Sequence, residues 1–63
     1  MTLKEFREVE ELTVQEVADL LFISKSMYEK LELNDRKPSI ATLKKIKQLY
    51  KAYNRPFNVD IFL

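Results

Sequence analysis

The sequence predicts an all-α protein, a compact bundle of four to five helices that contains a helix-turn-helix. Apolar residues recur at intervals of three and four positions, which is the spacing of one helix face. Serine or threonine stands just before each of these apolar segments, where its hydroxyl can cap a helix N-terminus. With 63 residues and no cysteine, the chain has no disulfide to support a small core, so packing between helices must stabilise the fold.

The first two helices are predicted at residues 2–11 and 14–21. Thr2 and Thr13 are each followed three residues later by a glutamate. This spacing is typical of a capping box, in which the hydroxyl and the carboxylate satisfy two backbone N–H groups that the helix leaves free. The residues that face the core from these two helices are Leu3, Phe6, Val17, Ala18 and Leu21.

Two further helices are predicted at residues 25–33 and 40–53. Ser24 and Ser39 are positioned to cap them, and Asn34-Asp35 marks a turn between them. The expected inward-facing residues are Met27 or Tyr28 and Leu31 in the third helix, and Leu43, Ile46, Leu49, Tyr50 and Tyr53 in the fourth.

Residues 55–63 form an apolar tail after the fourth helix. Apolar and polar residues alternate in most of this tail, as in a strand, but Phe57 and Ile61 also fit one turn of a helix. A lone strand has no pairing partner in a helical chain, so we predict a short helix. The tail either folds back onto its own core or packs against a second copy across a two-fold axis.

A homodimer is the arrangement that we favour for this tail. Five apolar residues elsewhere in the chain have no obvious core position, which is more than we expect on the surface of a small monomer. We therefore expect the tail to lie in an interface between two copies. The five residues are Val9, Val14, Leu20, Phe22 and Leu33, and the candidate dimer residues are Phe57, Val59, Ile61, Phe62 and Leu63.

The composition excludes several kinds of active site. The chain has no histidine, cysteine or glycine, which removes Ser–His and Cys–His nucleophiles, the usual zinc sites and glycine-rich phosphate loops. No apolar segment approaches the ~20 residues of a membrane span, and no signal peptide is recognisable. We expect a cytoplasmic protein that is not an enzyme and has no metal, no cofactor and no membrane contact.

Charge is distributed unevenly along the chain, although the net charge is only +1. Residues 1–35 contain four basic and nine acidic residues, a net charge of −5. Residues 36–63 contain seven basic residues and one acidic residue, a net charge of +6. A basic half of this kind indicates a polyanionic partner such as nucleic acid, although solvated helix faces produce the same pattern.

Residues 13–33 have the pattern of a helix-turn-helix within a single domain that spans residues 1–63. Ala18 is small enough to let two helices approach each other, Ile23 fills the turn and Ser24 caps the second helix. In such a unit the second helix lies in the DNA major groove, with its N-terminal residues against base edges. Small helical domains also use similar hairpins without binding DNA, so the pattern alone is not specific.

A longer set of residues extends this pattern across four helices. These residues are Leu3, Phe6 and Arg7, then Leu12-Thr13, Val17-Ala18, Leu21, Ile23-Ser24, Leu31-Glu32, Arg36-Lys37-Pro38-Ser39, Thr42-Leu43 and Ile46. Over about residues 3–50 the sequence therefore resembles the Cro/lambda-repressor-like family, also called XRE-type helix-turn-helix regulators. The resemblance implies a bundle of about five helices that binds palindromic operators in double-stranded DNA as a dimer.

The resemblance also implies roles for particular residues. The positions that read bases in the family correspond to Lys25, Ser26 and Lys30. The positions that contact phosphates correspond to Arg36, Lys37 and the start of the fourth helix, where Lys44 or Lys45 is the candidate. Gln15 is a further phosphate candidate, because backbone N–H groups at a helix N-terminus favour anions. Arg7 and Glu32 match a pair that links the first and third helices in the family and would be structural.

The sequence departs from the family at several positions. Val14 replaces a glutamine that contacts phosphate in the family, and Leu33 replaces an asparagine. Phe22 and Glu11 stand where glycine is common, and at Phe22 a bulky side chain must either strain the turn or change it. Asn34 also replaces a glycine but can adopt the left-handed conformation.

Two functions from different classes follow from these residues. The first is a DNA-binding transcriptional regulator, a repressor of phage or mobile-element type, that binds its operator as a homodimer. The second is a protein-interaction module on the same fold, such as an antirepressor or a modulator of another repressor. The departures from the family pattern and the acidic first half favour the second, and binding of mixed DNA at several salt concentrations distinguishes the two.

Overall fold

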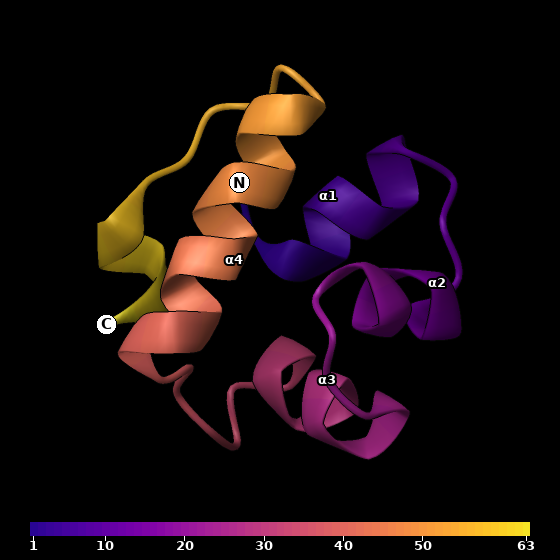
Figure 1. The fold of residues 1–63 in the computed structure, drawn as a ribbon, viewed down its shortest axis with the longest axis vertical. Helices are drawn as coiled ribbons and strands as arrows, with labels where there is room; N and C mark the ends of the chain where they lie inside the picture. Colours follow the sequence, from indigo (N-terminus) through magenta and orange to yellow (C-terminus); the bar gives the residue numbers. More distant parts are fainter.

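A computed structural model describes all 63 residues, and it contains four α-helices followed by one 3-10 helix. The all-α fold class is confirmed, and the tail forms a short helix and not a strand. None of the helices combines the length and apolar character that a membrane crossing requires. The elements are α1 (Leu3–Val9), α2 (Val14–Leu20), α3 (Lys25–Glu32), α4 (Ile40–Ala52) and η1 (Val59–Phe62) (Figure 1).

A side-chain hydroxyl caps the N-terminus of each α-helix. The Thr2 hydroxyl accepts a hydrogen bond from the backbone N–H of the third residue of α1 at 3.1 Å, and the Thr13 hydroxyl does so for α2 at 3.1 Å. In both cases the glutamate at that position accepts from the N–H of the threonine, so both predicted capping boxes are present. Ser24 and Ser39 cap α3 and α4 in the predicted way.

The C-terminus of each α-helix is closed by a residue in the left-handed conformation, although the chain has no glycine. The turn after α2 is representative: the N–H of Phe22 donates to the Asp19 carbonyl at 3.1 Å, and the N–H of Ile23 donates to the Ala18 carbonyl at 3.0 Å. This pair of bonds is the Schellman motif, in which the positive φ directs the chain back over the last helical turn. The four left-handed residues are Glu11 (φ 56°), Phe22 (φ 58°), Asn34 (φ 64°) and Asn54 (φ 56°).

We expected Phe22 either to strain the turn after α2 or to change it, and the structure shows the first of these. The turn keeps its usual hydrogen bonds, and the bulky residue adopts the left-handed backbone in the position that glycine commonly takes. The same geometry ends α1 two residues before the predicted boundary, because Glu11 already has a positive φ.

Ten apolar or aromatic residues form one buried core at the centre of the four helices. The Phe6 ring stacks on the Tyr50 ring with centroids 4.7 Å apart, which joins α1 to α4. The sequence left open whether Met27 or Tyr28 faces the core from α3. Tyr28 is fully buried, whereas Met27 is half-buried. The buried residues are Leu3, Phe6, Val17, Ala18, Leu21, Tyr28, Leu31, Ile46, Leu49 and Tyr50.

The C-terminal tail folds back along α4 (Figure 1). The rings of Phe57 and Phe62 lie 5.8 Å and 6.3 Å from that of Tyr50, and they stack on each other at 5.5 Å. Arg55 also forms an ion pair with Glu10, just after α1. The two phenylalanines, which we expected at a dimer interface, therefore pack partly against their own core.

The remaining tail residues and the unplaced apolar residues differ in their surroundings. Val59, Ile61 and Leu63 are exposed. Val14, which we expected to have no core position, is half-buried and packs against the core. Val9, Leu20, Phe22 and Leu33 are exposed, as is Ile40 at the start of α4.

Candidate DNA-binding surface

Helices α2 and α3 pack against each other and form the predicted helix-turn-helix. Ala18 is fully buried where the two helices meet, and Ile23 in the turn packs partly against the core. The Ser24 hydroxyl accepts a hydrogen bond from the N–H of Met27 at 3.1 Å and thereby fixes the start of α3. As a result, α3 lies at one edge of the molecule with its outer face free (Figure 1).

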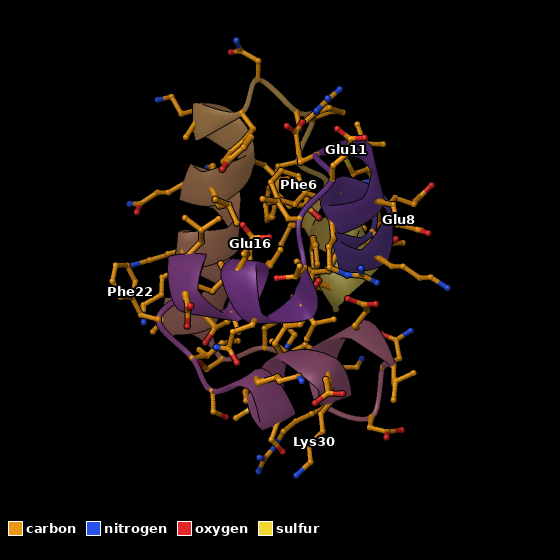
Figure 2. The ribbon with its side chains drawn as sticks, turned by 90° about the vertical axis from the view of Figure 1, so that its right-hand side faces the viewer. Phe6, Glu8, Glu11, Glu16, Phe22 and Lys30 are labelled. Carbon is orange, nitrogen blue, oxygen red and sulfur yellow. The ribbon has the colours of Figure 1, made fainter.

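The three residues implied to read bases lie on the exposed face of α3. Lys25, Ser26 and Lys30 are all exposed, whereas Tyr28 and Leu31 on the opposite face are buried. In Figure 2, Lys30 extends from α3 away from the rest of the protein. The lysine ammonium groups can donate to guanine O6 and N7, and the serine hydroxyl can pair with several bases.

Two further residues share this face: Glu29, which was not singled out from the sequence, and Leu33, which was noted there only as a departure from the family and as an apolar residue without a core position. Glu29 follows Lys25 by four positions and Leu33 follows it by eight, so helical spacing places all three side by side. A carboxylate can accept a hydrogen bond from cytosine N4 and repels phosphate, while an apolar side chain can contact the thymine methyl group. The i, i+4, i+8 spacing was the signal in the sequence that identifies them.

The residues implied to contact phosphates lie in three different elements. Arg36 and Lys37 are exposed in the loop between α3 and α4, and Lys44 is exposed on α4. The structure contains two ion pairs, and neither involves these three cations, which leaves them available to an anion. Gln15 is exposed on α2, but its amide donates a 2.8 Å hydrogen bond to Asp19, which places a carboxylate beside this phosphate candidate.

The pair implied to link the first and third helices is formed. Arg7 of α1 donates two parallel hydrogen bonds to Glu32 of α3, from Nη2 to Oε1 at 2.8 Å and from Nε to Oε2 at 3.1 Å. Both side chains are largely buried, with 20% and 13% of their surface exposed. The Arg7 guanidinium holds the pKa of the Glu32 carboxyl below its usual range, because it hydrogen-bonds the ionised form.

The exposed groups of this surface are suited to binding. No three acidic, histidine or cysteine side chains come together in a way that could hold a metal ion. The exposed groups of α3 and the following loop include donors of hydrogen bonds and positive charge, together with the carboxylates of Glu29 and Asp35. These groups suit recognition of an anionic polymer whose edges carry acceptors.

Comparison with known families identifies residues 3–54 as a helix-turn-helix domain. Comparisons with curated proteins and with solved structures found no significant match. The matched segment covers α1 to α4 and ends where the tail begins. It includes both helices of the helix-turn-helix and the Arg7–Glu32 pair that joins the unit to α1. The chain therefore belongs to the helix-turn-helix family of Cro/lambda-repressor-like (XRE-type) DNA-binding regulators.

Proposed function

We propose that this protein is a sequence-specific transcriptional repressor of phage or mobile-element type that binds a palindromic operator as a homodimer. The observation that carries the proposal is the outer face of α3. Lys25, Ser26 and Lys30 are exposed there, and the capped turn and the buried residues behind them hold the helix in place. A rigid helix with free donors at its N-terminal end is what base readout in the major groove requires.

In the proposed complex, α3 enters the major groove and the basic loop that follows it contacts the DNA backbone. Arg36, Lys37 and Lys44 supply the phosphate contacts, which give most of the affinity and make it dependent on salt. Lys25 at the start of α3 and Lys30 in its last turn donate to guanine and give specificity. Repression then follows from occupation of a promoter and requires no catalytic group.

The exposed end of the tail supports the homodimer. Val59, Ile61 and Leu63 stay on the surface after Phe57 and Phe62 have packed inward. An isologous contact between two copies of η1 buries these side chains and sets two α3 helices on one face of the DNA. Their expected separation is one helical turn, about 34–36 Å.

Selection of bound sequences from a random DNA pool, followed by footprinting, tests the proposal. The expected result is a palindromic consensus with two half-sites one helical turn apart. Protection of DNA without a consensus, or no binding at low salt, contradicts sequence-specific regulation. The latter result instead supports the alternative of a protein-interaction module on the same fold, such as an antirepressor.

Sedimentation tests the homodimer separately. We expect the intact chain to dimerise at tens of micromolar or on DNA, and the Ile61→Ser variant to dimerise more weakly. Ile40→Ser is the matched control, because Ile40 is 75% exposed on a different element. A chain that stays monomeric both in free solution and on DNA rules out the dimer.

A further inference from the structure

An apolar groove lies on the side of α2, next to the end of α4. Its lining combines four apolar or aromatic residues with two acidic ones, and it draws on three separate segments of the chain. We call it the α2–α4 groove, and its lining residues are Leu12, Glu16, Asp19, Leu20, Phe22 and Tyr53. None of these residues is among those implied to contact DNA.

Phe22 is the most exposed large apolar residue of the chain, with 81% of its surface accessible. Its backbone has a φ of 58°, a conformation that is unfavourable for a bulky residue. The ring gains little from its own chain: the ammonium of Lys45 lies over it, 5.7 Å from the ring centroid. Phe22 thus combines backbone strain with a large exposed apolar surface, and both features are unfavourable for the chain on its own.

The rim of the groove is acidic. Glu16 and Asp19 are exposed on α2 and form no ion pair. Each accepts one hydrogen bond from a neutral group, the N–H of Thr13 and the amide of Gln15, and keeps its charge uncompensated. The cation close to this side is Lys45, over the Phe22 ring. A negative rim around an apolar floor is complementary to a segment that carries an apolar anchor and basic flanks.

We propose that the α2–α4 groove binds a basic amphipathic segment of another protein. One large apolar side chain of that segment packs against Phe22, Leu20 and Tyr53, and flanking lysine or arginine residues pair with Glu16 and Asp19. Figure 2 shows Phe22 at one edge of the molecule and Lys30 of α3 at another. The two side chains therefore lie on different sides of the molecule, and this inference does not rest on the proposed DNA-binding function.

Selection from a displayed library of random 12-residue peptides tests the groove. We expect a consensus with a large apolar residue next to lysine or arginine. The synthetic consensus peptide is then titrated in a fluorescence anisotropy assay against the intact chain and its variants. Phe22→Asn should weaken binding by at least about thirtyfold, the size of effect seen at a central anchor residue. Asparagine tolerates the left-handed conformation, so the fold should be kept.

The charge of the rim is tested with two conservative variants. Glu16→Gln preserves the capping box, and Asp19→Asn preserves an acceptor for Gln15. Each should weaken peptide binding about two- to fivefold, as expected for an exposed ion pair, and added salt should remove the difference. Ile40→Ser is the matched control for Phe22→Asn and should leave peptide binding unchanged.

Several results overturn the proposal. One is the absence of any enriched consensus, and another is a consensus without basic residues. A third is peptide binding that persists unchanged in a folded Phe22→Asn variant, with folding verified by thermal unfolding. A fourth is a dimer of the intact chain that Phe22→Asn dissociates, since a second copy then fills the groove. DNA binding by the same variant separates failure of the groove from failure of the helix-turn-helix.

Discussion

Arg7 and Glu32, 25 positions apart in the sequence, form a bidentate ion pair that links α1 to the end of α3. The Nη2–Oε1 distance is 2.8 Å, and the second bond runs from Nε to Oε2 at 3.1 Å. The planar guanidinium matches the carboxylate with two parallel donors and so fixes direction as well as distance. Through this pair, α1 holds the helix that carries the candidate base-reading residues.

Arg7→Gln should lower the free energy of unfolding by about 1–3 kcal/mol. This range lies between the cost of breaking a buried pair and the small value of an exposed one, because both side chains are largely but not fully buried. Urea denaturation measures the change. A double-mutant cycle with Glu32→Gln is the control: the two losses should be less than additive, and full additivity contradicts a direct interaction.

The stability supplied by Glu32 should depend on pH in the acid range. Its pKa is lower in the folded chain than in the unfolded one, so the contribution is complete above the ordinary value of 4.5 and is lost as pH falls through the folded pKa. The stability difference between the parent chain and Glu32→Gln should therefore be constant near neutral pH and shrink below about pH 4.5. Glu29→Gln, an exposed change on the same helix, serves as the control. A difference that grows on acidification contradicts the assignment.

Glycine at a left-handed position should stabilise the protein. Glu11→Gly is expected to raise the free energy of unfolding by about 1 kcal/mol, because a residue with a Cβ is strained at a φ of 56° and glycine is not. The same substitution inside α1, Glu8→Gly, should have the opposite sign and cost about 1 kcal/mol. Thermal unfolding of both variants provides the comparison, and a loss of stability in Glu11→Gly contradicts the interpretation.

Removal of the Tyr28 hydroxyl should leave the stability unchanged or raise it by up to about 1 kcal/mol. This hydroxyl is buried beside the Arg7–Glu32 pair and makes no hydrogen bond of good geometry with it, so its desolvation cost is poorly compensated in the folded chain. Burial also raises the pKa of Tyr28 above its usual range. Tyr50→Phe is the matched control, because that hydroxyl donates to the Met1 carbonyl at 3.2 Å and its loss should cost about 0.5–1.5 kcal/mol. Equal losses in both variants contradict the prediction.

Lysines on α3 and in the following loop should affect DNA binding in different ways. Lys25→Ala is expected to cost about 1–3 kcal/mol on the selected operator and to relax the preference at one base position. Lys37→Ala should weaken binding about equally for all sequences and reduce the salt slope by about 1. Both are measured by titration of operator and mixed DNA at several salt concentrations. If Lys25→Ala and Lys30→Ala both leave DNA binding unchanged, the assignment of α3 to the DNA interface is wrong.

Local features of the sequence determined where the helices begin and that the fold is helical. The spacing from Thr2 or Thr13 to the following glutamate specifies a helix start within four residues, and the structure contains both capping boxes. The period of the apolar residues likewise selected the face of each helix that is buried. These features are predictable because the groups that interact are separated by three or four positions, so the chain can bring them together only as a helix.

Contacts between distant residues were decided by the tertiary structure. The alternation in the tail fits more than one conformation, and only the nearness of the Tyr50 ring shows that Phe57 and Phe62 turn inward. The ion pair of Arg55 with Glu10 spans 45 positions and has no local signal. The sequence also left open whether Phe22 strains its turn or changes it, and the structure shows a left-handed backbone in a turn of regular hydrogen bonds, with an exposed ring. In each case the cause is the same: the free energy depends on which surfaces the assembled helices leave available, and no short stretch of sequence contains that information.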